Sequence, residues 1–229
     1  MAMAARWGTT MGRGMAGTAM AEAGMSTDLL RLTQWLSPAF PVSGYAYSHG
    51  LETAVAEGRV HDGASCRDWV AGVLRHGTGA LDAWAIGAVM AGALPDAVEA
   101  TIRARAGSAE RWQETRDMGA AFVGATRATG EPAIPDLTLP VALGLRARGM
   151  ERAVVVALYL QSFAGQLVSA AVRLVPLGQT EGQTILRDLH REILDLAAVD
   201  QADPPGSAAL LAELDAMRHE TLSPRIFRT

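Results

Sequence analysis

Residues 153–175 read AVVVALYLQSFAGQLVSAAVRLV, and this apolar stretch decides the fold class. The run is too long for a strand, so it predicts a helix that is buried on most sides. A membrane-spanning helix needs about 20 mostly apolar residues, whereas Gln161, Gln166 and Arg173 interrupt this stretch. We therefore interpret it as the central helix of a bundle and not as a membrane span.

The composition is that of a globular helical protein. Of 229 residues, 49% are hydrophobic, 19% are charged and 5% are aromatic, and alanine is abundant. A core of small and aliphatic side chains suits closely packed helices better than a β-sandwich. The sequence predicts a single all-α domain of about ten helices with no significant sheet.

Charge and cysteine content exclude several functions. The net charge is −4, which gives no reason to expect a nucleic-acid partner. All 20 basic residues are arginine, so lysine-based catalysis and a P-loop lysine are excluded. Cys66 is the single cysteine, which excludes an intrachain disulfide and fits a reducing, cytoplasmic setting.

The two ends differ from the middle of the chain. Residues 1–26 predict a disordered tail or a start codon assigned too far upstream, with Met25 as the alternative start. Gly12, Gly14 and Gly17 form a literal GxGxxG, but no strand precedes it and no helix follows, so dinucleotide binding is not expected. Residues 27–220 form the predicted domain, and 221–229 form a predicted partner-binding tail that orders on its partner.

Local signals set the expected helix boundaries. Ser65 and Asp68 resemble a capping box, Pro95 suits a first helical turn, Ser108 can cap a helix, and Glu151 begins the central one. Pro176 and Gly178 end it. The expected helices are residues 29–36, a short one with Leu51 and Val55, one after Ser65, 80–93, one from Pro95, 108–129, 140–148, the central helix, one amphipathic helix reaching Val199, and 208–219.

Catalytic patterns are weak. Asp188, Glu192 and Asp195 have helical spacing, which leaves open a small enzyme of isoprenoid-synthase type, but nearby arginines favour a solvated, ion-paired face. No two of the five histidines share a ligand-like spacing, and no nucleophile motif is present. We expect no catalytic residue, no metal ligand and no bound cofactor.

Three segments contain proline, glycine, aromatic or polar residues that the packing of a helical bundle does not require. Residues 37–52 read SPAFPVSGYAYSHGLE, and residues 167–183 read LVSAAVRLVPLGQTEGQ. A rigid connector and a helix C-cap are the structural alternatives for these two. In the tail, Phe227 lies between arginines, and aromatic residues with arginine dominate interface hot spots.

These segments give the chain a resemblance to the UreF family of urease accessory proteins. SPAFPVSGYAYSHGLE is similar to that family's N-terminal signature, and LVSAAVRLVPLGQTEGQ to its most recognisable stretch. RWQETRDMG (111–119), LPVALG (139–144) and MRHETLSPRIFRT (217–229) resemble further blocks. The resemblance runs in order from about residue 28 to the C-terminal end.

The resemblance implies a cytoplasmic, all-α homodimer without catalysis of its own. It implies binding to UreD (also called UreH) and to the GTPase UreG, in an assembly that handles nickel and delivers it to apo-urease. Matching motifs point to Arg225, Phe227 and Arg228 for UreD, and to Arg173 and Gln179 for UreG. Tyr45, Tyr47, Ser48 and Glu52 match the signature, with a role in folding or in binding left open.

Two positions depart from the family pattern. Leu139 stands where many members have histidine, which puts a nickel-relay role there in doubt. Ser223-Pro224 stands where Tyr-Ser is usual, and proline fixes φ and removes a donor.

Overall fold

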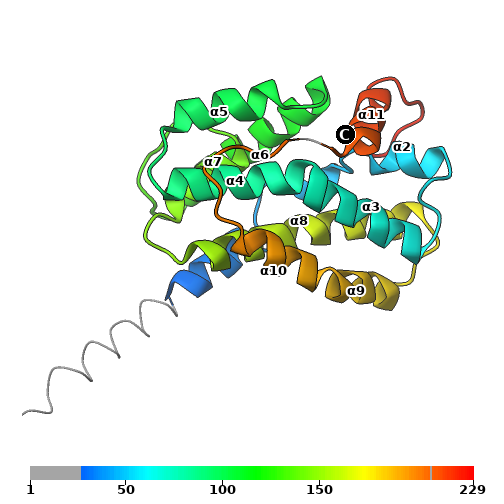
Figure 1. Ribbon diagram of the computed structural model, residues 1–229, viewed down its shortest axis with the longest axis horizontal. Coiled ribbons are helices and arrows are strands. Elements are labelled where there is room, and N and C mark those ends of the chain that lie inside the picture. The colour runs from blue at the N-terminus through cyan, green and yellow to red at the C-terminus, as the bar shows by residue number, and fades with distance from the viewer. Residues whose placement is uncertain (1–26, 207) are drawn as a thin grey trace, which may run out of the picture.

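A computed structural model describes residues 27–206 and 208–229, and these form helices and connections without a strand. This confirms the predicted all-α fold. Figure 1 shows two central helices, described below, with the other helices packed around them. The predictions for residues 1–26, including the glycine motif, lie outside the described residues.

The apolar stretch forms the central helix α8, Arg152–Leu174, as expected. Glu151 caps it by accepting a bond from the Ala153 amide. Its buried residues include Val156, Leu160 and Leu167, and it packs against α2, α3, α4, α9 and α10.

By length and composition alone α8 is apolar enough to cross a membrane. Core helices of soluble bundles meet the same criterion, and half of its most apolar window is buried.

The second central helix is α4, Thr78–Met90, which begins where α3, Gly63–His76, ends. The cap of α3 differs from the expectation. Asp62 is the N-cap and Ser65 is the third helical residue, and the two side chains bond reciprocally with each other's backbone. Ser65 therefore belongs to the capping box, but Asp68 does not.

Helices α5 (Pro95–Ala104) and α7 (Leu139–Arg146) pack against α4, and α6 (Ala109–Ala128) packs against α7 (Figure 1). Pro95 and Ser108 occupy the helix starts that the sequence predicts. Gly119 permits the close approach of α6 to the start of α7. A Cβ at Gly119 would meet the Leu137 carbonyl oxygen and lie 2.7 Å from the Leu139 nitrogen.

The remaining helices close the domain. One helix was expected up to Val199, but Leu189 separates α9, Gln179–Asp188, from α10, His190–Ala198. Both still bury one apolar face against the core. The last helix, α11, is Leu210–His219, and it packs on the short α2, Leu51–Ala56, and on α6.

Candidate functional site

The signature segment, residues 37–52, folds into a tight, largely buried turn. A 3-10 helix, η1 (Gly44–Ala46), precedes the buried residues Tyr47 and Ser48. His49 and Gly50 then have φ of 62° and 83° in the left-handed region. Gly50 suits this position because a Cβ would lie 2.7 Å from the Ala216 nitrogen of α11. The turn thus places α2 directly against α11.

The C-terminal segment, residues 221–229, lies on this turn. The Ser48 amide and hydroxyl both donate to the Thr229 backbone oxygen, at 2.7 and 2.5 Å. The amides of Ile226 and Phe227 donate to the Glu52 carboxylate at 2.7 and 2.9 Å. These bonds hold the backbone of the segment along the signature turn.

Residues 221–229 therefore pack on the domain in this structure and do not extend from it, and their binding to a partner stays a prediction. Phe227 is only 4% exposed and belongs to the core of this chain. The physical reason is the buried carboxylate of Glu52, which offers acceptors for two backbone amides beside an apolar pocket. The Ser223-Pro224 bond is cis, and the segment beyond it still reaches Ser48.

His219 connects the segment to the helices. Its side chain is fully buried at the end of α11. Nε2 lies 3.2 Å from a Glu52 oxygen, and Nδ1 lies 2.8 Å from a Glu110 oxygen of α6. The second Glu110 oxygen accepts from Arg225 at 2.5 Å. Two carboxylates, one imidazole and one guanidinium therefore connect α2, α6, α11 and the C-terminal segment.

A second polar cluster lies beneath the signature turn. The Thr229 hydroxyl donates to Glu114 at 2.8 Å, and the Glu114 carboxylate also meets Arg111 at 3.1 Å and His49 at 3.5 Å. Burial would raise the pKa of Glu114, but Arg111, His49 and the Thr229 hydroxyl outweigh it and lower this pKa to about 2. Glu114 is thus held as a carboxylate.

Asp82 and Tyr159 extend this cluster into α4 and α8. The Tyr159 hydroxyl donates to Asp82 at 2.5 Å, and Arg111 lies 3.8 Å from the same oxygen. Burial raises the pKa of Asp82, although Arg111 and Tyr159 oppose the shift. Burial and the neighbouring Asp82 also raise the pKa of Tyr159. These groups are buried in the interior and bonded to one another.

The depressed pKa of Glu114 makes stability depend on acid pH. Its contribution is complete above the unfolded value near 4.5 and is lost as pH falls towards about 2. We expect the free energy of unfolding to fall by about 2–3 kcal/mol over this range. Urea titrations between pH 5 and pH 2.5 measure it. Glu114→Gln should have a lower free energy of unfolding than the wild type at pH 7, and this free energy should change less between pH 5 and pH 2.5. An equal change with pH in the two proteins would contradict this role.

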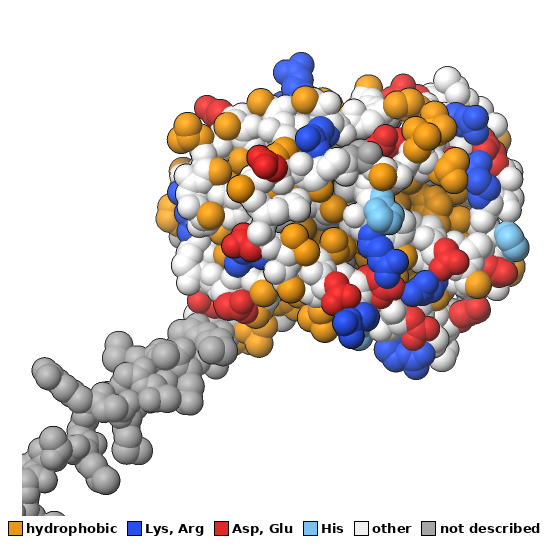
Figure 2. Space-filling view, viewed as in Figure 1, with side chains coloured by type: hydrophobic (Ala, Val, Ile, Leu, Met, Phe, Trp, Pro, Cys, Tyr) orange, Lys and Arg blue, Asp and Glu red, His pale blue; other side chains and the backbone are white. Residues whose placement is uncertain are grey.

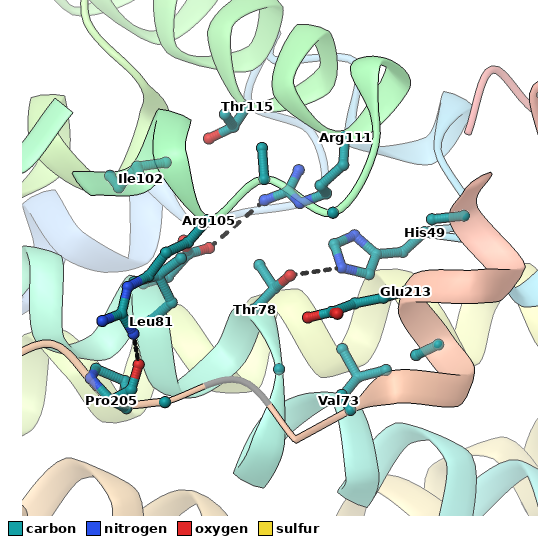
Figure 3. Close-up of a pocket in the computed structure, with 18 residues that line it drawn as sticks. His49, Val73, Thr78, Leu81, Ile102, Arg105, Arg111, Thr115, Pro205 and Glu213 are labelled. Carbon is teal, nitrogen blue, oxygen red and sulfur yellow. Dashed lines mark hydrogen bonds and ion pairs between the residues drawn. The ribbon is translucent and has the colours of Figure 1, made fainter. Parts of the chain in front are cut away.

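A small pocket borders this cluster, and Figure 3 shows its lining. His49 points to Thr78 of α4, with 2.8 Å between Nε2 and the hydroxyl oxygen. Arg111 enters from α6, while Arg105 donates to the Pro205 carbonyl oxygen. Each labelled cation or imidazole thus contacts a protein group. Arg105, together with Trp84 of α4, holds residues 202–205 against the domain.

The surface above the turn carries the exposed residues. Tyr45 is 68% exposed and Ile226 is 75% exposed. Arg173 of α8 donates to the Tyr45 carbonyl oxygen at 3.3 Å and lies 5.1 Å above the Phe227 ring. Arg228 lies over the Tyr47 ring at 5.6 Å. We name the five exposed side chains gathered here the tail surface: Tyr45, Arg173, Arg225, Ile226 and Arg228.

The predicted site residues therefore divide into two groups. Tyr47, Ser48, Glu52 and Phe227 are buried and hold the C-terminal segment in place. Tyr45, Arg173, Arg225 and Arg228 are exposed on the tail surface. Gln179, at the start of α9, is also exposed and lines a groove along α8 that Tyr45 shares.

Sequence reasoning missed His219, Glu110 and Glu114. His219 was interpreted as one of several lone histidines, because its carboxylate partners are 109 and 167 residues away. A signal was available in the 111–119 block, where Arg111 and Glu114 accompany Asp117. Asp117 faces Tyr47 and Arg228, at 3.5 and 3.8 Å.

The acidic triplet does not assemble into one site. Glu192 is 4% exposed and accepts from Arg67 and Arg75 at 2.7 and 2.8 Å. Asp188 and Asp195 are exposed and pair with neighbouring arginines. Figure 2 shows acids and arginines intermixed over this face. Within residues 27–206 and 208–229, no three His, Cys, Asp or Glu side chains group as metal ligands. The isoprenoid-synthase alternative therefore has no support in the geometry.

Leu139 lies at the start of α7 and is part of the hydrophobic core. Its side chain packs near Met118 and Phe163 around a second small pocket. The departure from histidine at this position is thus accommodated as apolar packing.

Comparisons with known proteins give the family of the chain. The family model described as UreF matches residues 60–190. The urease accessory protein UreF of Jannaschia sp. (strain CCS1) is 52% identical over 214 residues, covering 91% of this chain and 97% of that protein. The protein of the same name from Cereibacter sphaeroides (strain KD131 / KCTC 12085) is 52% identical over 211 residues, covering 90% of this chain and 100% of that protein. That of Ruegeria pomeroyi (strain ATCC 700808 / DSM 15171 / DSS-3) is 43% identical, with 88% and 96% covered. The chain therefore belongs to the family of the urease accessory protein UreF.

Proposed function

We propose that this chain is a non-catalytic maturation factor of urease that works by binding other proteins. The observation that carries the proposal is the tail surface, where exposed aromatic, aliphatic and arginine side chains gather over a buried scaffold. Such residues dominate binding energy at interfaces. The family name, urease accessory protein, supplies the process that this binding serves.

The tail surface is held in place before any partner arrives. Glu52 and Ser48 bind the backbone of residues 226–229, so the exposed Arg225, Ile226 and Arg228 have fixed starting positions. A partner then has little backbone to order, and ordering is a main cost of association. This arrangement suits a scaffold that binds one protein at the tail surface and a second protein at another surface.

We assign the partners from the family resemblance and this placement. UreD (UreH) would bind the C-terminal side of the tail surface, around Arg225 and Arg228. The GTPase UreG would bind the face of Arg173 and Gln179, along the groove of α8. The chain would act as a cytoplasmic homodimer that bridges these proteins for nickel insertion into apo-urease, with nickel handled by the complex.

Arg228→Ala tests the proposal at an exposed position. We expect binding to UreD to weaken about tenfold, because the guanidinium is lost from the surface. The melting temperature should stay unchanged, since an exposed pair contributes little stability. Titration of purified UreD and UreG onto the labelled chain measures both affinities.

Arg187→Ala is the matched control, because Arg187 is an exposed arginine of α9 outside the tail surface. It should bind like the wild type. A wild-type chain that assembles with neither UreD nor UreG would refute the proposed function. A large drop in the melting temperature of Arg228→Ala would instead make this arginine structural.

A further inference from the structure

The buried ring of His219 contacts carboxylate oxygens on both of its nitrogens. Nδ1 faces Glu110 at 2.8 Å and Nε2 faces Glu52 at 3.2 Å. A neutral imidazole carries a hydrogen on only one nitrogen, so it can donate to one carboxylate and must turn a lone pair towards the other. Only the imidazolium form satisfies both contacts.

The carboxylates on either side are themselves stabilised as anions. Glu52 accepts from the amides of Ile226 and Phe227, and Glu110 accepts from Arg225. Hydrogen bonds to the charged form favour that form. This places the proton of each contact on the ring and not on a glutamate. The charged groups that face His219 are Glu52 from α2 and Glu110 from α6, and Arg225 of the C-terminal segment pairs with Glu110. On its own helix and helix end, Arg218, Glu220 and Asp215 bond to other groups.

The same carboxylates hold the C-terminal segment. If His219 loses its proton, one glutamate oxygen faces a lone pair in a site without solvent, where an unpaired charge is costly. If that oxygen belongs to Glu52, the carboxylate must move or take up a proton, and either change weakens its bonds to Ile226 and Phe227. If it belongs to Glu110, the same change weakens the pair with Arg225.

We propose that His219 is a proton-dependent latch: its imidazolium form keeps residues 225–229 closed on α2 and α6, and deprotonation releases them. The consequence for partner binding rests on the proposed function, because the released residues are those of the tail surface. With the imidazolium form the tail surface is preformed, and with the neutral ring it loosens.

Hydrogen exchange of the isolated full-length chain tests the latch without any partner. The amides of Ile226 and Phe227 report directly on the bonds to Glu52. After correction for intrinsic exchange, their protection should fall at least about tenfold between pH 6 and pH 8.5, while amides of α4 keep theirs. The ring ¹⁵N shifts of His219 should change from imidazolium values with the same midpoint.

Glu110→Gln separates the proton from the packing. A carboxamide can donate to Nδ1, so a neutral ring can satisfy Gln and Glu52 together. In this variant protection of Ile226 and Phe227 should persist at pH 8.5. In His219→Gln the amides of Ile226 and Phe227 should exchange fast at every pH. His190→Gln, at an exposed histidine of α10, is the matched control, and its amides should exchange as in the wild type. Circular dichroism and thermal melting show that each variant folds.

The outcomes are distinct. Unchanged protection in the wild type from pH 6 to pH 8.5, or an unaltered pH profile in Glu110→Gln, would overturn the latch. Titration of UreD across the same pH range tests the consequence separately. A latch that opens while UreD fails to bind at any pH would refute the proposed function and leave the latch standing.

Discussion

Glu52→Gln is expected to lower the free energy of unfolding by about 3 kcal/mol at pH 7. The buried carboxylate accepts from two backbone amides and contacts the His219 ring. A carboxamide has one acceptor oxygen, and its NH₂ group would face a donor. At least one buried donor loses its partner, and His219 loses a counter-charge. Urea unfolding followed by circular dichroism measures the change.

Glu57→Gln is the matched control for this substitution. Glu57 lies one turn beyond Glu52 and pairs at the surface with Arg59 and Arg218. We expect it to change stability by less than about 1 kcal/mol, because exposed pairs contribute little. Equal losses in the two variants would show that Glu52 acts only as one more surface charge.

Gly119→Ala is expected to destabilise the chain by about 2–3 kcal/mol. The new methyl group would meet the backbone of residues 137–139, which cannot turn aside as a flexible side chain does. The start of α7 would have to shift away from α6, and Leu139 and Val141 would move with it. Thermal and urea unfolding measure the loss.

Gly124→Ala, in the same helix, is expected to raise the free energy of unfolding. No heavy atom lies within 4 Å of a Cβ built there, so alanine brings only its helix propensity. We expect a gain of about 0.5–1 kcal/mol. If both variants were stabilised, the close approach of α6 and α7 would not be a constraint on the fold.

Much of the fold could be predicted from local patterns. The apolar run of α8, the proline of α5 and the Ser108 cap of α6 each act within a few residues, and each was found where expected. The break at Leu189 was missed because the apolar stripe of Ile185, Leu189 and Ile193 continues through it. The cap of α3 was placed three residues late, since Asp62 and Ser65 both suit an N-terminus.

The candidate site was predictable only in its parts. The sequence indicated residues 37–52 and 221–229 separately, but no local pattern shows that Ser48 meets Thr229 across 181 residues. The burial of Phe227 follows from that contact. The sequence of residues 221–229 alone does not show what covers this ring, so it predicts an interface. His219 has no sequence neighbour that marks it, because both its partners come from other helices.

The contact between Ser48 and Thr229 also has a consequence for synthesis. Contacts of high sequence separation form late, because loop closure over the intervening chain must come first. The tail surface therefore does not exist on a nascent chain until nearly all of the described chain has left the ribosome. A truncated or stalled chain lacks the residues that complete it. The tail surface is therefore among the last features of this domain to form, after the turn and the helix that carry Ser48 and Glu52.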